Sequence, residues 1–471
     1  MASDIQTAFE VLRASVTEGR AENVRYRQNE LYSLHSALRE NPELICDAIA
    51  KDYAGSREKA ETEFYLAMDA VRISYEKLDF DKALEVEYSV KFGKDNTKRR
   101  AALGLVHIRP TRHSRFYSVI TPLVAALEAG NCIFVELDRS SPAVDRVLLE
   151  ILPKALDRDT FHISQERLDE EYLNQVNFFV DENDDELSAS AKDSHTPLKG
   201  RTVCILDRTG DLELAAKFLS STQTSSDYTS PYSPDLLLVN EYLKDTFITR
   251  CLDFASQVEH SSSAKVATSE ELEFQTLLRQ AESEGEIITH KRKIGFTIVE
   301  LKNRSSKLAS KKVSGRYLLL LPAAGIVDSV TSQRTSPKFL ASYIFAAPAA
   351  AKFIGEQITS HATYINQVPP QLLIGPPSPT NHPHVLHPRF TSDMFSTPQP
   401  QFIVPPTSLP PPFKLMELAL RQLKPTGQRP GHAIGFFEQG ILLGLGSTAL
   451  VVLPLLGWGL FRAVKFGMRY I

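Results

Sequence analysis

Residues 120–143 read ITPLVAALEAGNCIFVELDRSSPA, and this stretch passes from a helical pattern into a strand-like pattern. Residues 118–129 are helical in pattern, residues 132–137 form an apolar run of strand length, and residues 142–156 are helical again. The alternation extends to further strand-like runs (104–108, 176–180, 202–206, 236–239, 318–321, 342–345) and helical runs (212–219, 245–257). It predicts an α/β fold with doubly wound, mostly parallel sheets.

The residues before position 100 are helical in pattern instead. Leu31, Leu34 and Leu38 mark one apolar stripe, and Asn41 followed by Pro42 is typical of the start of the next helix. A third helix is predicted over residues 61–78. The sequence therefore predicts an N-terminal helical region ahead of the sheets.

Length and composition indicate a globular chain of several domains. The 471 residues allow roughly two to four domains, and 42% hydrophobic residues can form large cores. Basic and acidic residues nearly balance at 53 and 57, which argues against a surface for nucleic acid. The four cysteines, Cys46, Cys132, Cys204 and Cys251, form no CxxC pair, and no His/Cys cluster has zinc spacing. We therefore predict a reducing compartment and no metal site.

The end of the chain contains a candidate membrane span. Residues 440–461 read GILLGLGSTALVVLPLLGWGLF, an uncharged run of 22 residues that is long enough to cross the hydrocarbon core of a bilayer. Basic residues follow it, and Trp458 suits an interfacial position. Pro454 leaves two arrangements open, a kinked spanning helix or a hairpin that re-enters the same side. We expect a single-pass C-terminal anchor with the body in the cytosol, in the endoplasmic reticulum, mitochondrial outer membrane or peroxisome.

A proline-rich segment precedes the candidate span. Fourteen of the 28 prolines lie within residues 369–412, which we expect to run extended over the body and then act as a spacer. Residues 413–423, FKLMELALRQL, follow as a short amphipathic helix. We expect this helix to lie on the membrane surface ahead of the anchor.

Several stretches, in order, resemble the aldehyde dehydrogenase superfamily, and especially its membrane-anchored fatty-aldehyde (class 3) branch. Besides residues 120–143 they are YRQNELYSLHSALRENPELICDAIAKDYAG (26–55), GDLELAAKFL (210–219), DLLLVNEYLKDTFI (235–248), ASYIFAAPAAAKFIGEQITSHATYIN (341–366) and HPRFTSDMFSTPQP (387–400). The apolar tail completes the resemblance, which covers nearly the whole chain. It implies N-terminal helices with a degenerate nucleotide-binding-like domain over 1–205 and a catalytic-like α/β domain over 206–368. The proline-rich segment (369–412), the amphipathic helix with its linker (413–439) and the anchor (440–461) follow.

The resemblance also implies where catalytic groups should lie. The family's cysteine nucleophile, which forms a thiohemiacetal, falls at Ser225 in Thr222-Gln223-Thr224-Ser225. None of the four cysteines aligns with it, and Cys132 and Cys204 lie in apolar strand runs, as small buried residues do. The asparagine that donates to the oxyanion falls at His113.

The cofactor contacts differ from the family's as well. Glu136 takes the place of the lysine that binds the adenosine ribose, and an acidic run that begins with Asp181 and Glu182 and extends to residue 186 takes the place of the pyrophosphate cradle. The segment with the family's general base is missing at 197–201. The glutamate that holds the nicotinamide ribose falls near Gly315.

These combined changes lead to three hypotheses. The first is a tail-anchored pseudoenzyme that acts as a scaffold, as a partner of an active paralogue, or as a carrier of an apolar ligand, with no cofactor expected. The second is an active NAD(P)-dependent oxidoreductase that converts long-chain or isoprenoid aldehydes to carboxylic acids. The third is a structural membrane protein whose fold implies nothing about a substrate. We expect membrane lipid as a partner through the anchor, a homo-oligomer or an active paralogue as a further partner, and no nucleic acid.

Overall fold

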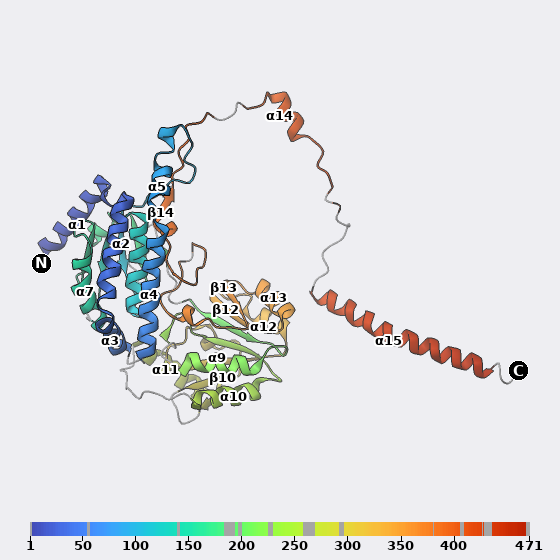
Figure 1. Ribbon diagram of the computed structural model, residues 1–471. Helices are drawn as coiled ribbons and strands as arrows, with labels where there is room; N and C mark the ends of the chain where they lie inside the picture. Colours follow the sequence, from blue (N-terminus) through green and yellow to red (C-terminus); the bar gives the residue numbers. More distant parts are fainter. Residues whose placement is uncertain are drawn as a thin grey trace. The chain divides into compact units, whose positions relative to one another are not determined.

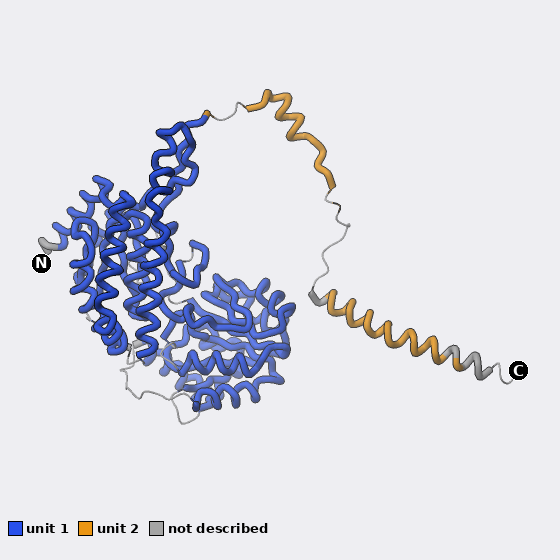
Figure 2. The backbone as a smooth tube through the Cα atoms, in the orientation of Figure 1, with its two compact units in different colours: residues 1–404 blue, residues 405–471 orange. Residues whose placement is uncertain are grey.

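The computed structural model describes residues 2–53, 57–138, 142–182, 194–195, 200–224, 229–257, 269–291, 296–379, 381–405, 409–425, 427 and 436–467. The chain divides into two compact units, residues 1–404 and residues 405–471, which Figure 2 colours separately. The first unit contains both large sheets and their helices. The second contains α14 (Pro412–Ala419) and α15 (Phe436–Gly467).

The N-lobe of the first unit is built on a five-stranded sheet with the order β4-β3-β2-β5-β6, in which every neighbouring pair is parallel. Its strands are β2 (Leu105–Arg109), β3 (Cys132–Glu136), β4 (Phe161–Ser164), β5 (Phe178–Asp181) and β6 (Ser194–His195). The helices of the N-lobe are α1 (Ala2–Glu18), α2 (Val24–Arg39), α3 (Pro42–Tyr53), α4 (Arg57–Lys77), α5 (Phe80–Glu87), α6 (Arg115–Ala129), α7 (Ala143–Ala155) and α8 (Glu170–Leu173).

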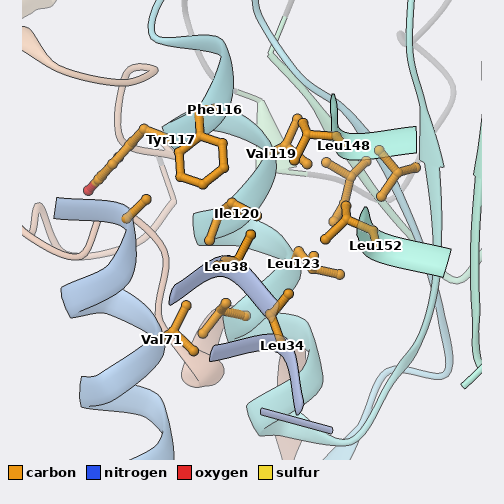
Figure 3. Packing of buried hydrophobic residues seen from close by; sticks show 14 of the residues in the cluster. Leu34, Leu38, Val71, Phe116, Tyr117, Val119, Ile120, Leu123, Leu148 and Leu152 are labelled. Carbon is orange, nitrogen blue, oxygen red and sulfur yellow. The ribbon is translucent and has the colours of Figure 1, made fainter. Parts of the chain in front are cut away.

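Successive side chains of the N-lobe strands point to opposite faces of the sheet. Val106, Ile133 and Val135 pack into a cluster with α2, α4, α6 and α7, whereas Leu105 and Phe134 pack against α1. Figure 3 shows the first cluster, in which Leu34 and Leu38 of α2 meet side chains of α6. Helices therefore cover both faces of the sheet, as a doubly wound fold requires.

The turn between α6 and β3 explains the glycine in the quoted stretch. Gly130 adopts φ 92°, and its N–H donates to the carbonyls of Ala126 and Leu127 to close the helix. A Cβ atom there would lie 3.1 Å from the carbonyl oxygen of Ala21. The glycine thus permits both the turn and the close approach of the N-terminal helices.

The C-lobe is built on a seven-stranded sheet with the order β13-β12-β7-β8-β11-β10-β9, parallel except for β9. Its strands are β7 (Thr202–Leu206), β8 (Leu236–Asn240), β9 (Ile287–Lys291), β10 (Thr297–Leu301), β11 (Tyr317–Ala323), β12 (Phe339–Phe345) and β13 (Ser360–Ile365). Its helices, labelled in Figure 1, are α9 (Leu212–Thr224), α10 (Lys244–Gln257), α11 (Ser269–Ser283), α12 (Ile326–Gln333) and α13 (Pro348–Gln357). The two parallel sheets confirm the predicted α/β fold class.

One predicted boundary needs correction. The division at residues 205 and 206 cuts through β7, which pairs with β8 and β12, so the seven-stranded sheet begins at Thr202. Within the segment 369–412, Leu372, Phe390 and Phe395 are buried in the body. Its end also pairs with the N-lobe through β1 (Arg100–Ala102) and β14 (Ser396–Pro398).

Candidate functional site

Adjacent parallel strands place their carboxyl ends along one edge of the N-lobe sheet. Arg109 ends β2, Glu136 ends β3 and Asp181 ends β5, and β2 lies between the other two. Arg109 is in register with Asp181. Open parallel sheets bind ligands at this kind of edge. The predicted cofactor positions Glu136 and Asp181 are therefore brought together here.

Charged side chains along this edge bind one another inside the protein. Arg109 Nε donates to Glu136 Oε1 at 3.1 Å, and Arg109 Nη1 lies 3.6 Å from Asp181 Oδ2. His107 Nε2 lies 3.2 Å from Glu136 Oε2. All four side chains are at most 6% exposed. We call His107, Arg109, Glu136 and Asp181 the strand-end network.

Burial and pairing fix the charges of this network. Burial lowers the pKa of His107 and so favours the neutral imidazole. Burial alone would raise the pKa of Glu136, but the close contact with His107 and the charge of Arg109 hold that pKa below its ordinary value. Glu136 is therefore an internal counter-ion of Arg109. Sequence reasoning identified the carboxylate but not the cation that neutralises it.

Glu182, the next residue in the acidic run, points into the body. Its Oε2 accepts a hydrogen bond of 2.9 Å from the backbone N–H of Thr111. The side chain is fully buried, and burial raises its pKa to about 8, so Glu182 holds a proton at neutral pH. The remaining predicted acidic residues at 184–186 lie outside the described residues.

His113 lies at the start of α6, before Ser114 with φ 46°. Its Nε2 donates to the carbonyl oxygen of Leu373 at 2.7 Å, because a carbonyl can only accept. Its Nδ1 lies 3.1 Å from the hydroxyl of Thr229. Both ring nitrogens are thus engaged by the protein itself, and the N–H that could serve an oxyanion is bound to a peptide carbonyl.

The predicted nucleophile Ser225 lies outside the described residues. The helix that leads to it, α9, ends at Thr224 with buried side chains. Gln223 Nε2 donates to Ser233 Oγ at 3.2 Å and to the carbonyl of Pro234 at 3.1 Å. The residues before position 225 are therefore anchored to the loop that precedes β8.

Gly315 has a conformational reason to be glycine. It adopts φ 100° just before β11, and a Cβ atom would lie 3.0 Å from both a carboxylate oxygen of Glu271 and the ring of Tyr317. Nearby, Lys312 Nζ donates to the buried Asp235 at 2.8 Å. The place predicted for the nicotinamide-ribose contact thus contains a turn that requires glycine and an internal ion pair.

All four cysteines are buried. Burial raises the pKa of the Cys132 thiol to about 12, and it also raises the pKa values of Cys204 and Cys251. Thiols in such surroundings are unreactive, since the thiolate is the nucleophile. The prediction that Cys132 and Cys204 are small buried residues is confirmed. Among the described residues, no group of three or more His, Cys, Asp and Glu side chains has the geometry to hold a metal ion.

The sequence reasoning missed two further buried charges near the site. Arg115, at the first turn of α6, donates to both carboxylate oxygens of Asp145 at 2.8 and 2.9 Å. Arg389, which lies within the proline-rich segment, is fully buried and lies 5.1 Å above the ring of Tyr232. The charged residues beside apolar runs could have indicated that these side chains are buried, but the sequence does not show which groups they bind.

The second unit contains one helix that is long and apolar enough to cross a membrane, considering the described residues only. The span is Glu438–Gly459, 22 residues with a mean hydropathy of 2.0, and it lies within α15. Pro454 lies inside this helix, which continues through it. Length and composition thus agree with the predicted span, and the continuous helix favours a kink over a hairpin.

Comparison with known proteins connects this geometry to a family. The profile of the aldehyde dehydrogenase family matches residues 1–171. Aldehyde dehydrogenase family 3 member B2 of Mus musculus is 31% identical over 156 residues, which cover 32% of each chain. Aldehyde dehydrogenase family 3 member A2 of Pongo abelii is 22% identical over 358 residues, which cover 71% of this chain and 74% of that protein. The chain spans between about a third and about a half of the length of the first curated relatives it matches.

A solved structure shows the same fold. Aldehyde dehydrogenase C (AldC) of Pseudomonas syringae, solved as a mutant in complex with NAD+ and octanal, superimposes with a TM-score of 0.70 at 13% identity, over 87% of this chain and 90% of that one. Its sequence identity is low enough that this likeness describes the fold alone. The family profile over residues 1–171 and the family 3 relatives support a class 3-like member of the aldehyde dehydrogenase superfamily, and the AldC structure supports the shared fold.

Proposed function

We propose that this chain is a membrane-anchored, aldehyde-dehydrogenase-like pseudoenzyme that acts by binding, as a scaffold or as a partner of other proteins. The strand-end network carries this proposal. At the sheet edge where the fold would receive a nucleotide, Glu136 and Asp181 are buried and paired with Arg109. The edge stabilises the protein itself instead of presenting donors to a ligand.

The residues at the predicted cofactor positions do not fit NAD or NADP. A pyrophosphate needs N–H donors or cations, whereas Asp181 and Glu182 offer carboxyl groups that are already engaged with Arg109 and Thr111. A ribose would need the lysine that Glu136 replaces, and the Glu136 carboxylate is held by Arg109. The misfit therefore has two causes: these carboxyl groups already bind protein groups, and carboxylates repel a pyrophosphate.

His113 supports the same proposal from the side of the chemistry. An oxyanion needs preorganised donors that are free to bind it. The Nε2–H of His113 is bound to the carbonyl of Leu373, and Thr229 contacts the other ring nitrogen. An aldehyde at this place would have to displace the protein's own peptide group.

Membrane anchoring is the second part of the proposal. The candidate span has a glutamate at its start, Glu438, and Arg462 follows it with its guanidinium 4.7 Å above the ring of Trp458. Such flanks suit the two membrane–water interfaces. The lipid bilayer is then one partner. A second copy of this chain or an active paralogue is a further partner, which the body would bind.

A second candidate function is an active NAD(P)-dependent oxidoreductase for long-chain or isoprenoid aldehydes. The AldC structure, which contains NAD+ and octanal, favours it through the shared fold. The apolar span favours it too, because an anchor keeps a site close to lipid-derived aldehydes. This function would need a nucleophile at Ser225 and an opening of the contacts at His113.

Titration calorimetry separates the two candidates. The full-length chain in detergent micelles is titrated with NAD and with NADP, and a variant with Asp184→Asn, Asp185→Asn and Glu186→Gln serves as the matched control. We expect no saturable binding below millimolar concentration for the native chain, and equal or tighter binding for the neutralised variant. Micromolar binding to the native chain would refute the pseudoenzyme proposal.

Cell fractionation tests the anchor. Deletion of residues 440–471 should move the protein from the carbonate-washed membrane pellet to the soluble fraction while the body keeps its unfolding transition. Val451→Lys should weaken insertion by roughly 3 kcal/mol, since a charge would lie at the centre of the span. Leu415→Lys, in α14 outside the span, is the control. A truncated protein that still pellets would contradict anchoring by α15.

A further inference from the structure

Residues 369–379 and 381–390, called the strap here, hold three consecutive peptide carbonyls in one clasp. The carbonyl oxygens of Leu372 and Ile374 accept from Arg389 Nη2 at 3.2 and 3.3 Å. The carbonyl between them, that of Leu373, accepts from His113 Nε2 at 2.7 Å. The strap therefore presents its backbone to the residue predicted to be the oxyanion donor.

Arg389 is placed to hold the strap in this shape. Its guanidinium is fully buried and stacks over Tyr232, and Nη1 lies 3.4 Å from the carbonyl of Val385 and 3.5 Å from the hydroxyl of Ser378. A buried guanidinium that satisfies several carbonyls fixes their relative positions, because its donors have a rigid planar geometry. The strap thus folds around its own arginine.

Two tyrosines and two histidines fasten the strap to both lobes. On the N-lobe side, the hydroxyl of Tyr117 in α6 contacts His387 Nδ1 at 3.0 Å and accepts from the N–H of Arg389 at 3.2 Å. On the C-lobe side, Tyr364 of β13 contacts His384 Nε2 at 2.7 Å. Figure 3 shows the Tyr117 hydroxyl pointing away from the labelled leucines of the cluster.

The backbone of the strap also lies directly against the N-lobe. Gly375 adopts φ 86°, and a Cβ atom there would lie 2.5 Å from the ring of Tyr117. Leu372 and Leu373, on the other side of the clasp, are buried in the hydrophobic cluster of the C-lobe. The same short stretch is therefore packed on both lobes.

We propose that the strap is an intramolecular lock, which fills the oxyanion position with the Leu373 carbonyl and ties the N-lobe to the C-lobe. This inference rests on the proposed function, since an active enzyme needs that position open. It identifies His113 and Arg389 as positioning residues for the strap. The chain itself supplies the occupant of the position that a substrate would take.

Hydrogen exchange followed by mass spectrometry tests the lock on the full-length chain in micelles. Useful reporters are the N–H groups of Leu372, bound to the Pro369 carbonyl at 3.0 Å, and of Ser378, bound to the Tyr232 hydroxyl at 3.0 Å. His113→Ala and Arg389→Met are compared with His382→Ala, which lies in the same strap outside the clasp. Loss of one buried hydrogen bond shifts local opening by about tenfold.

We expect about tenfold faster exchange of peptides covering 370–378 in His113→Ala, more in Arg389→Met, and less than twofold change in His382→Ala. The half-exposed His113 can be removed without emptying the core, so His113→Ala decides the test even if Arg389→Met fails to fold. Equal exchange in His113→Ala and His382→Ala would overturn the lock. Micromolar NAD binding would instead overturn the proposed function, because that titration does not measure the strap.

Discussion

One sheet of this protein has two regions that differ sharply, its apolar faces and its carboxyl edge. On the faces, Val106, Ile133 and Val135 are fully buried against helices, as an aldehyde dehydrogenase fold needs. At the edge, Arg109 and Glu136 are almost as deeply buried, but they bind each other. The scaffold is retained in both regions. Only the edge contains internal ion pairs between its strand ends.

The difference lies in how each region depends on its partners. A buried ion pair seldom adds much stability compared with apolar residues, yet removing one partner leaves a costly unpaired charge. The edge should therefore be sensitive to the loss of any one of its charged partners. The apolar faces have no such dependence on a single partner.

The largest expected effect tests the edge. Arg109→Met should destabilise the protein by about 3–5 kcal/mol, because Glu136 and Asp181 would remain buried without their cation. Urea unfolding followed by circular dichroism measures this change. Adding Glu136→Leu and Asp181→Leu to Arg109→Met should recover most of the loss. A loss below about 1 kcal/mol in the single variant would mean that the edge is open to solvent and free to bind.

A slightly smaller effect tests the faces. Leu123→Ala, in a fully buried position of α6, should cost about 2–5 kcal/mol through lost burial and a cavity. The same unfolding measurement applies, and Leu44→Ala at an exposed position is the control. A second substitution of a neighbouring apolar residue by a smaller one should not restore stability, whereas the second and third substitutions at the edge should. Recovery by such a second change would erase the distinction between the two regions.

The third effect depends on pH and isolates Glu182. Its folded-state pKa of about 8 lies above the ordinary value of 4.5, so the folded chain retains a proton that the unfolded chain releases. The stability from this group is fully present below about pH 4.5 and is lost as the pH rises toward 8. Glu182→Gln keeps the acceptor for Thr111 and removes the charge.

The variant should therefore match the native chain near pH 5 and exceed it in stability near pH 8. The free energy of unfolding is measured for both proteins across this pH range. Groups that titrate in the same way in both proteins cancel when the two values are subtracted. Parallel curves would show that Glu182 is not a protonated buried acid.

The sequence predicted the faces better than the edge for a physical reason. Runs such as 132–137 and 202–206 are mostly apolar because both faces of a parallel strand are buried. The edge strand β9 is half exposed and lacks this signal, so it was missed. Glu136 and Asp181 were located by resemblance, but their pairing with Arg109 depends on a strand order that sequence spacing does not reveal.

The strap was missed for a related reason. Its proline content predicted an extended segment over the body, and that part was informative. The clasp, however, joins His113 to Leu373 and Tyr117 to His387, which are far apart in the sequence. Only the folded arrangement of both lobes brings these groups together.

The most direct test of the central claim is an assay of aldehyde oxidation. The full-length protein is incubated with NAD or NADP and a long-chain aldehyde, and reduced cofactor is measured by absorbance for the native chain, Ser225→Ala and Ser225→Cys. We predict no reduced cofactor above background in any of the three, because under the proposed function a restored thiol would supply only one of several catalytic parts that act as a unit. Cofactor reduction by the native chain that Ser225→Ala abolishes would contradict the account and establish an active oxidoreductase.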